Sequence, residues 1–246
     1  MGFYEELSKY YDIIFPYSKV KLDFMLDKIE GEEPVSVLDI ACGTGSYSIE
    51  LAKLGHKVSG IDLDEDMIRI AKEKSAEFEN EIDFRVADMR DIKEIFNTTF
   101  DLIYCIGNSL VHLQSYEDVI SELKLINEML KEKGKLVIQI INYDRIFKYD
   151  LECLPTIDRE EEGVKFIRKY DYNLKEDKMY FNTKILIDRD GEAKGYDNSV
   201  PLLPLRSNVF NNMLKDCGFN KINFYGDFNG SKFNSESYPL IVVAEK

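Results

Sequence analysis

The sequence has few basic residues for the number of its acidic ones, and this shortage excludes one class of partner. Its 246 residues include 32 Lys and Arg against 46 Asp and Glu, which gives a formal charge of −14 at pH 7. An anionic nucleic-acid backbone is held mainly by clustered Lys and Arg. We therefore expect no nucleic-acid groove on this protein.

Closely spaced cysteines and long apolar runs are missing as well. The four cysteines lie far apart and form no Cys-x-x-Cys pair, and no other ligand cluster is visible, so no metal site is expected. The longest apolar runs, such as 102–106 and 240–244, are much shorter than the roughly 20 residues that span a bilayer. The first residues include neither a basic leader nor an apolar signal segment. These features predict a cytoplasmic protein with reduced thiols and no membrane partner.

A repeated pattern in the first half of the chain predicts the fold class. Two helical patterns occupy residues 1–34, and short β-branched runs then alternate with amphipathic segments. The runs cover 35–40, 57–62, 82–87, 100–106 and 134–141, and the helical segments cover 46–54, 65–77 and 116–131. A further helix at 207–218 and two last strand-like runs, 222–227 and 238–246, complete the pattern. Together they predict an α/β, Rossmann-like, doubly wound fold, with a mostly parallel seven-stranded sheet and helices on both faces.

The pattern changes after residue 150. Two long strand-like runs, 164–174 and 178–187, are separated by a short polar turn, and a second turn follows at 188–191. We expect residues 151–202 to form an antiparallel β meander that acts as a lid. It would be inserted into an α/β domain made of residues 1–150 and 203–246.

The stretch VLDIACGTGSYSIELA carries the strongest functional signal. An apolar strand runs into Gly43-Thr44-Gly45 and directly out into a helix. Glycines let a ligand approach the backbone without a Cβ in the way, and the first N–H groups of the helix point at that ligand. A site is therefore expected at the carboxyl edge of the sheet. Asp62 ends the second strand, where its carboxylate can accept hydrogen bonds from two ribose hydroxyls.

These features also describe a dinucleotide site, and three residues decide between the two ligands. Ser48 stands where Gly-x-Gly-x-x-Gly has its third glycine. Asp39 lies just before the glycines, where its charge would repel a pyrophosphate and suit a cation; a simple cap on the glycine turn is the alternative. Asp88 ends the third strand, where it can accept from an adenine amine or form a local Asx-turn. Together they favour an adenosine that carries a positive group.

On these motifs the chain resembles the class I S-adenosylmethionine-dependent methyltransferases, over nearly its whole length. The resemblance depends on VLDIACGTG, GIDLDEDM, ADMRD and CIGNSLVHL, in that order. It implies S-adenosyl-L-methionine as cofactor and S-adenosyl-L-homocysteine as product. It also implies a set of cofactor-binding residues: Gly43 and Gly45 along the methionine and ribose, Asp62 at the ribose, Asp88 and Met89 at the adenine, Leu63 and Met67 packed on its ring, and the Cys105 and Ile106 backbone at the methionine ammonium.

Within that superfamily, GNSLVHL followed by INYDRI is most similar to the glycine and sarcosine N-methyltransferase branch. That branch places an arginine before Asn-Tyr-Asp to clamp the carboxylate of its substrate, whereas this chain has Ile141. An aliphatic side chain cannot pair a carboxylate, and an anion that is buried without a partner is costly. The architecture and the cofactor are therefore expected here, but glycine is not expected as the substrate.

The expected reaction is methyl transfer to a nitrogen or oxygen of a small molecule. A sulfonium methyl group is already activated, so the enzyme has mainly to align the acceptor and exclude water. We expect Asn108, His112, Tyr11 and Tyr143 to line the acceptor pocket. The alternatives are structural hydrogen bonding for the histidine and core or lid packing for the tyrosines. The motifs leave open the identity of the acceptor and the oligomeric state. A nicotinamide-dependent oxidoreductase and a non-catalytic cofactor-binding module remain as other classes.

Overall fold

The computed structural model describes residues 3–29, 31, 33–78, 82–189 and 192–246. Its larger sheet has seven strands in the order β10-β11-β5-β4-β1-β2-β3. These strands are β1 Ser36–Ile40, β2 Lys57–Asp62, β3 Asp83–Val86, β4 Phe100–Cys105, β5 Leu130–Ile141, β10 Asn220–Tyr225 and β11 Pro239–Glu245. Strands β1 to β5 run parallel to one another, β11 is antiparallel to β5, and β10 is antiparallel to β11. The predicted mostly parallel, seven-stranded sheet is confirmed.

Helices cover both faces of this sheet because its strands are apolar on both sides. In β5, Leu136 and Ile138 pack into the cluster under α5, α6 and α8, whereas Val137 packs into the cluster under α2, α3 and α4. Successive side chains of a strand point to opposite faces, so one continuous apolar run supplies both clusters. The helices are α1 Phe3–Ile14, α2 Lys19–Leu26, α3 Ser46–Lys53, α4 Glu65–Ser75, α5 Ile92–Ile95, α6 Tyr116–Met129, α7 Tyr143–Tyr149 and α8 Ser207–Asp216, with short 3-10 turns η1 Met89–Asp91, η2 Leu110–His112 and η3 Glu160–Glu162.

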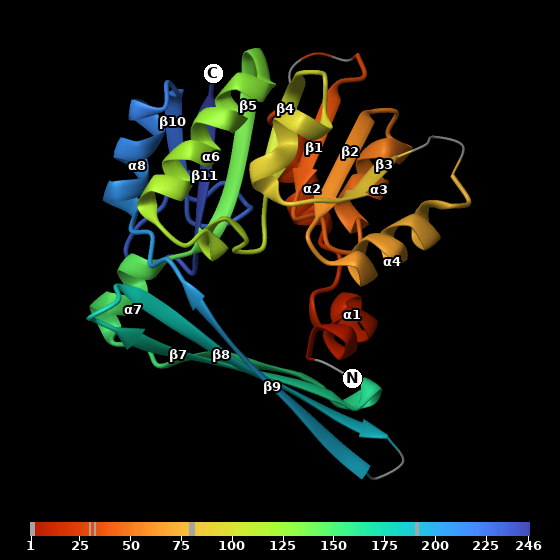
Figure 1. Cartoon of the computed structure of the whole chain (residues 1–246), viewed down its shortest axis with the longest axis vertical. Coiled ribbons are helices and arrows are strands. Elements are labelled where there is room, and N and C mark those ends of the chain that lie inside the picture. The colour runs from red at the N-terminus through yellow and green to blue at the C-terminus, as the bar shows by residue number, and fades with distance from the viewer. Residues whose placement is uncertain (1–2, 30, 32, 79–81, 190–191) are drawn as a thin grey trace.

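The second sheet is the antiparallel meander. Its strands β6 Cys153–Arg159, β7 Val164–Asn173, β8 Lys178–Arg189 and β9 Glu192–Leu202 pair in chain order. The turn predicted at 188–191 lies partly outside the described residues. Neither β6 nor the short helix α7 was among the elements predicted individually from the sequence. Figure 1 shows the meander lying across one end of the larger sheet, with α7 beside one part of it and α1 beside another.

None of the helices in the described part of the chain is both long enough and apolar enough to span a bilayer.

Asn142 joins α7 to the last loop of the chain and is 1% exposed. Its Oδ1 accepts from the Arg145 N–H at 3.2 Å, and its Nδ2 donates to the Ser237 carbonyl at 2.8 Å. Asn142→Ala leaves these buried groups unpaired, so we expect the free energy of unfolding to fall by about 1–3 kcal/mol. Urea unfolding checks this, with the exposed Asn229→Ala as control. Equal stability of the two variants would contradict the structural role of Asn142.

Candidate functional site

The turn between β1 and α3 forms the floor of the site, and its two glycines are required sterically. Gly43 and Gly45 have φ values of +55° and +71°, which disfavour any other residue. A Cβ on Gly45 would lie 2.5 Å from Cζ of Phe84. A Cβ on Gly43 would lie 3.2 Å from Cε1 of Tyr11. The turn is therefore a bare stretch of backbone that α1 approaches from above.

Asp62 holds this turn in place from the end of β2. Its Oδ2 accepts from the Gly43 N–H at 2.8 Å, and its Oδ1 accepts from the Asp64 N–H at 3.0 Å. Burial raises the pKa of Asp62, and these backbone hydrogen bonds oppose that rise. The hydrogen bond between Gly43 and Asp62 was not predicted from the sequence. A cap on the glycine turn was the alternative considered for Asp39, but the Gly43 N–H donates to Asp62.

Asp39 instead lies beneath the turn, 3% exposed. Its Oδ2 accepts from Ser48 Oγ at 2.6 Å and from the Tyr104 hydroxyl at 2.7 Å. Burial raises the pKa of Asp39 to about 7, while these two hydroxyls lower it and the charge of Asp62 raises it. No described residue donates a hydrogen bond to Oδ1 of Asp39. A cation bound at this turn would favour the charged form of the carboxyl, since opposite charges attract strongly at low dielectric.

The helix α1 is fastened over the turn by a polar cluster that the sequence did not reveal. Asp12 Oδ1 accepts from Thr44 Oγ1 at 2.6 Å, and Asp12 Oδ2 pairs with Lys74 Nζ at 2.8 Å. Lys74 also donates to Ser46 Oγ at 2.8 Å. These partners are 28 to 62 residues apart along the chain, so no local pattern could predict them. Tyr11 is thereby held on Gly43, where burial and the nearby Asp62 raise its pKa and keep the hydroxyl neutral.

The residues predicted to hold an adenine lie where β2 and β3 end at the same edge. Asp88 begins η1, accepts from the Arg90 N–H at 3.0 Å and pairs with the Arg90 guanidinium at 2.6 Å. These hydrogen bonds from Arg90 lower the pKa of Asp88. The local turn considered for Asp88 is therefore present. Leu63 is 71% exposed and available to a ligand, whereas Met67 is 5% exposed and lies in the core; Met89 is half-buried.

The loop after β4 carries the other predicted residues. Cys105 is buried and Ile106 half-buried. Asn108, with φ of +73°, braces the loop on β5, because its Oδ1 accepts from the Ile141 N–H at 2.9 Å. Tyr143 is 1% exposed, and Asn108 lowers its pKa while burial raises it. His112 is exposed at the end of η2, and partial desolvation lowers its pKa, which favours a neutral imidazole.

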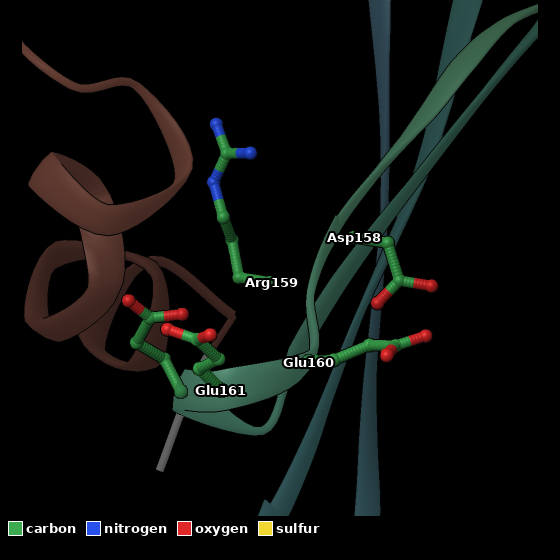
Figure 2. A pocket seen from close by; sticks show the side chains of 5 residues that line it. Asp158, Arg159, Glu160 and Glu161 are labelled. Carbon is green, nitrogen blue, oxygen red and sulfur yellow. The ribbon is translucent and has the colours of Figure 1, made fainter.

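A shallow acidic hollow elsewhere carries no comparable chemistry. It has a volume of about 460 Å³ and is lined by Asp158, Arg159, Glu160, Glu161 and Glu162. Figure 2 shows Arg159 directed toward α1, away from Asp158 and Glu160. Its Nε donates to the Ile13 carbonyl at 2.9 Å. Across the described ranges, no three His, Cys, Asp or Glu side chains lie together as metal ligands would. We assign this hollow no part in the site.

Comparisons with known proteins show that the chain is similar to methyltransferases. Residues 37–134 match the family model described as a methyltransferase domain. The chain is 29% identical over 212 residues to the Bacillus subtilis (strain 168) protein YqeM, whose name as a methyltransferase is provisional; the match covers 85% of this chain and 83% of that one. It is 28% identical over 227 residues to the glycine/sarcosine N-methyltransferase of Aphanothece halophytica, covering 91% and 81%. A solved S-adenosylmethionine-dependent methyltransferase from Clostridium acetobutylicum ATCC 824 has a similar fold, with a TM-score of 0.82, 20% identity and 98% of each chain covered.

The raised pKa of Asp39 has a consequence for stability. Between the ordinary pKa of 3.8 and about 7, the folded chain keeps a proton that the unfolded chain has lost. The stabilisation that this proton brings is full below the ordinary value and is lost as the pH rises through about 7. The free energy of unfolding of wild type minus that of Asp39→Asn should therefore fall as the pH rises from 3.8 to about 7.

Urea unfolding of both proteins at several pH values measures this difference. Glu122, a buried carboxyl whose pKa is raised to about 8, titrates in both proteins and cancels. The same difference for Asp216→Asn, an exposed residue at the end of α8, should stay flat. A difference for Asp39→Asn that is also flat, or rises with pH, would show that burial does not raise the pKa of Asp39.

Proposed function

Since the chain belongs to the class I S-adenosylmethionine-dependent methyltransferases, we propose that it methylates a nitrogen or oxygen of a small-molecule acceptor. It is a transferase, and its cofactor is S-adenosyl-L-methionine. The alternative of a nicotinamide-dependent oxidoreductase has no support among these relatives.

The observation that best supports this proposal is the buried carboxyl beneath the bare glycine turn. A Cβ on Gly45 would strike the Phe84 ring and a Cβ on Gly43 would crowd the Tyr11 ring, so the two glycines let the turn pack closely and leave its backbone bare at these positions. Asp39 turns one oxygen to Ser48 and Tyr104, and no described residue donates to the other. A negative group in that position suits a ligand that carries a sulfonium and an ammonium, and it disfavours a pyrophosphate.

Further residues around the turn would hold the rest of the cofactor. Asp62 would accept from the ribose hydroxyls while it keeps the Gly43 N–H. Asp88 and the Met89 backbone would meet the adenine, with Leu63 against its ring. The remaining contacts would come from the side chain of Met67 and from the backbone of Cys105 and Ile106.

The acceptor would lie between the glycine turn and the meander. S-adenosyl-L-methionine, when bound, supplies a methyl group that is already activated for transfer. The protein then has to orient the acceptor lone pair and exclude water, and α1 and the meander provide the cover. Tyr11 lies on the turn, Tyr143 opens α7 beside the loop of Asn108, and a neutral His112 can accept a proton.

Two observations support a small acceptor. The formal charge of −14 is unfavourable for a nucleic-acid substrate. One relative is named for glycine and sarcosine, which are small amines. Ile141 stands directly before the Asn-Tyr-Asp segment and cannot pair a carboxylate, so glycine held at that position is not proposed as the acceptor.

Asp62→Ala tests the proposed cofactor site. The change removes both the ribose acceptor and the cap on the Gly43 N–H, so we expect the affinity for S-adenosyl-L-homocysteine to fall at least tenfold, about 1.4 kcal/mol or more. Asp62→Asn keeps one carbonyl acceptor, so its affinity for S-adenosyl-L-homocysteine should fall by less. Calorimetry measures both.

Asp66→Ala is the matched control, because it removes an acid from the exposed side of α4, where it pairs with Arg69 at 3.0 Å. We expect its affinity to be unchanged. Wild-type affinity in Asp62→Ala would contradict the assignment of the site.

A further inference from the structure

The meander sheet carries two apolar rows on the face that it turns toward the rest of the chain. Cross-strand partners lie on the same face, and so do residues two apart along a strand. One row packs with α1, and the other packs with the core of the larger sheet. The first row is Phe166, Ile185 and Tyr196, and the second is Tyr170, Phe181 and Val200. The two rows fix the meander to two different parts of the molecule.

Arg168, Thr183 and Asn198 pair across the sheet between these apolar rows, and we call them the polar row. Thr183 is 5% exposed. Asn198 Nδ2 donates to the hydroxyl of Tyr4 on α1 at 3.1 Å. The polar row therefore lies between the apolar row that packs on α1 and the apolar row that packs on the core of the larger sheet. The acceptor is proposed to lie in this part of the molecule.

Arg168 has hydrogen-bonding capacity that the chain does not use. Its Nη2 donates to the Pro155 carbonyl at 2.5 Å, but its buried Nε has no partner. Among the residues that the structure describes, no carboxylate pairs with this guanidinium, although the chain has 46 Asp and Glu. Burial lowers the pKa of Arg168, and the neighbouring Tyr170 opposes that shift.

Two buried tyrosine hydroxyls in the same region also form no hydrogen bond of normal distance and angle, although Asn108 lies close enough to the Tyr143 hydroxyl to oppose the rise in its pKa that burial causes. They belong to Tyr170, two residues further along β7, and to Tyr143 at the start of α7. Burial raises the pKa of Tyr170, the nearby Tyr143 raises it further, and the charge of Arg168 lowers it, so Tyr170 lies near both of the other groups. A buried polar group that lacks a partner costs about 1–3 kcal/mol. Three such groups in one place indicate a ligand that supplies acceptor atoms to all of them.

We propose that Arg168, together with the hydroxyls of Tyr143 and Tyr170, binds an oxyanion of the methyl acceptor. This inference depends on the proposed function, because it takes the space beneath the meander as the acceptor site. A guanidinium donates two parallel hydrogen bonds to a carboxylate or a phosphate, and tyrosine hydroxyls can donate to the remaining lone pairs. The acceptor is then a small amine or alcohol that carries a carboxylate or a phosphate. The anion is held from the meander and not from position 141 of the larger sheet.

Anion binding to the protein saturated with S-adenosyl-L-homocysteine tests the proposal. Acetate, inorganic phosphate and the neutral acetamide are titrated by calorimetry into wild type and Arg168→Gln. We expect wild type to bind at least one anion and to bind acetamide at least tenfold more weakly. Arg168→Gln should weaken anion binding at least tenfold, and Arg168→Lys, which keeps the charge but loses the fork, should lie between them. The preferred anion distinguishes a carboxylate from a phosphate.

Lys169→Gln is the matched control, since it removes the same charge from the next residue, which is exposed on the opposite face of β7. It should bind the anions as wild type does. Anion binding that is absent in wild type, unchanged in Arg168→Gln, or equally weakened in Lys169→Gln would overturn the proposal. Binding of S-adenosyl-L-homocysteine separates the two ideas: if wild type does not bind it, the proposed function fails, and if both proteins bind it equally, a negative anion result rejects the oxyanion site alone.

Discussion

The hydrogen bond from the Gly43 N–H to the Asp62 carboxylate is the contact on which the geometry of the site depends. It joins the end of β2 to the turn after β1 and holds the positive-φ backbone of Gly43 in position. Asp39 lies beneath the same turn, so two carboxylates are held near bare backbone at one sheet edge. Burial and the charge of Asp62 both raise the pKa of Asp39, and a bound cation would favour its charged form. The cofactor of this enzyme class carries such a positive charge.

Enclosure of the site comes from segments that are distant in sequence. Asp12 ties α1 to the turn through Thr44 and Lys74, while Phe15 packs edge-on against Phe166 of the meander, with ring centroids 5.7 Å apart. The helix thus contacts both the floor and the cover of the proposed acceptor space. This connection gives a physical reason why the cofactor and acceptor sites would respond to each other.

The sequence predicted the larger sheet well because its signals are local. Alternating apolar runs and helical segments, and glycines followed by an acid at the next strand end, each lie within a few turns of chain. The residues it missed depend on long-range packing. In the sequence, Tyr104 cannot be distinguished from the apolar residues around it in a buried strand. In the structure, its hydroxyl donates to Asp39 across the β1–β4 pair at 2.7 Å. Arg168 gave no signal because the facing of a meander residue depends on register, which its sequence leaves open. The predicted roles of Asn108, His112 and Met67 at bound ligands remain predictions.

A crystal structure of the protein with S-adenosyl-L-homocysteine would show directly whether the glycine turn holds the cofactor. We expect the nucleoside beside Gly43 and Gly45, with its ribose hydroxyls within hydrogen-bond distance of Asp62 and its methionine portion above Asp39. A ligand bound elsewhere on the chain, or a glycine turn that stays empty at saturating concentration, would contradict this expectation.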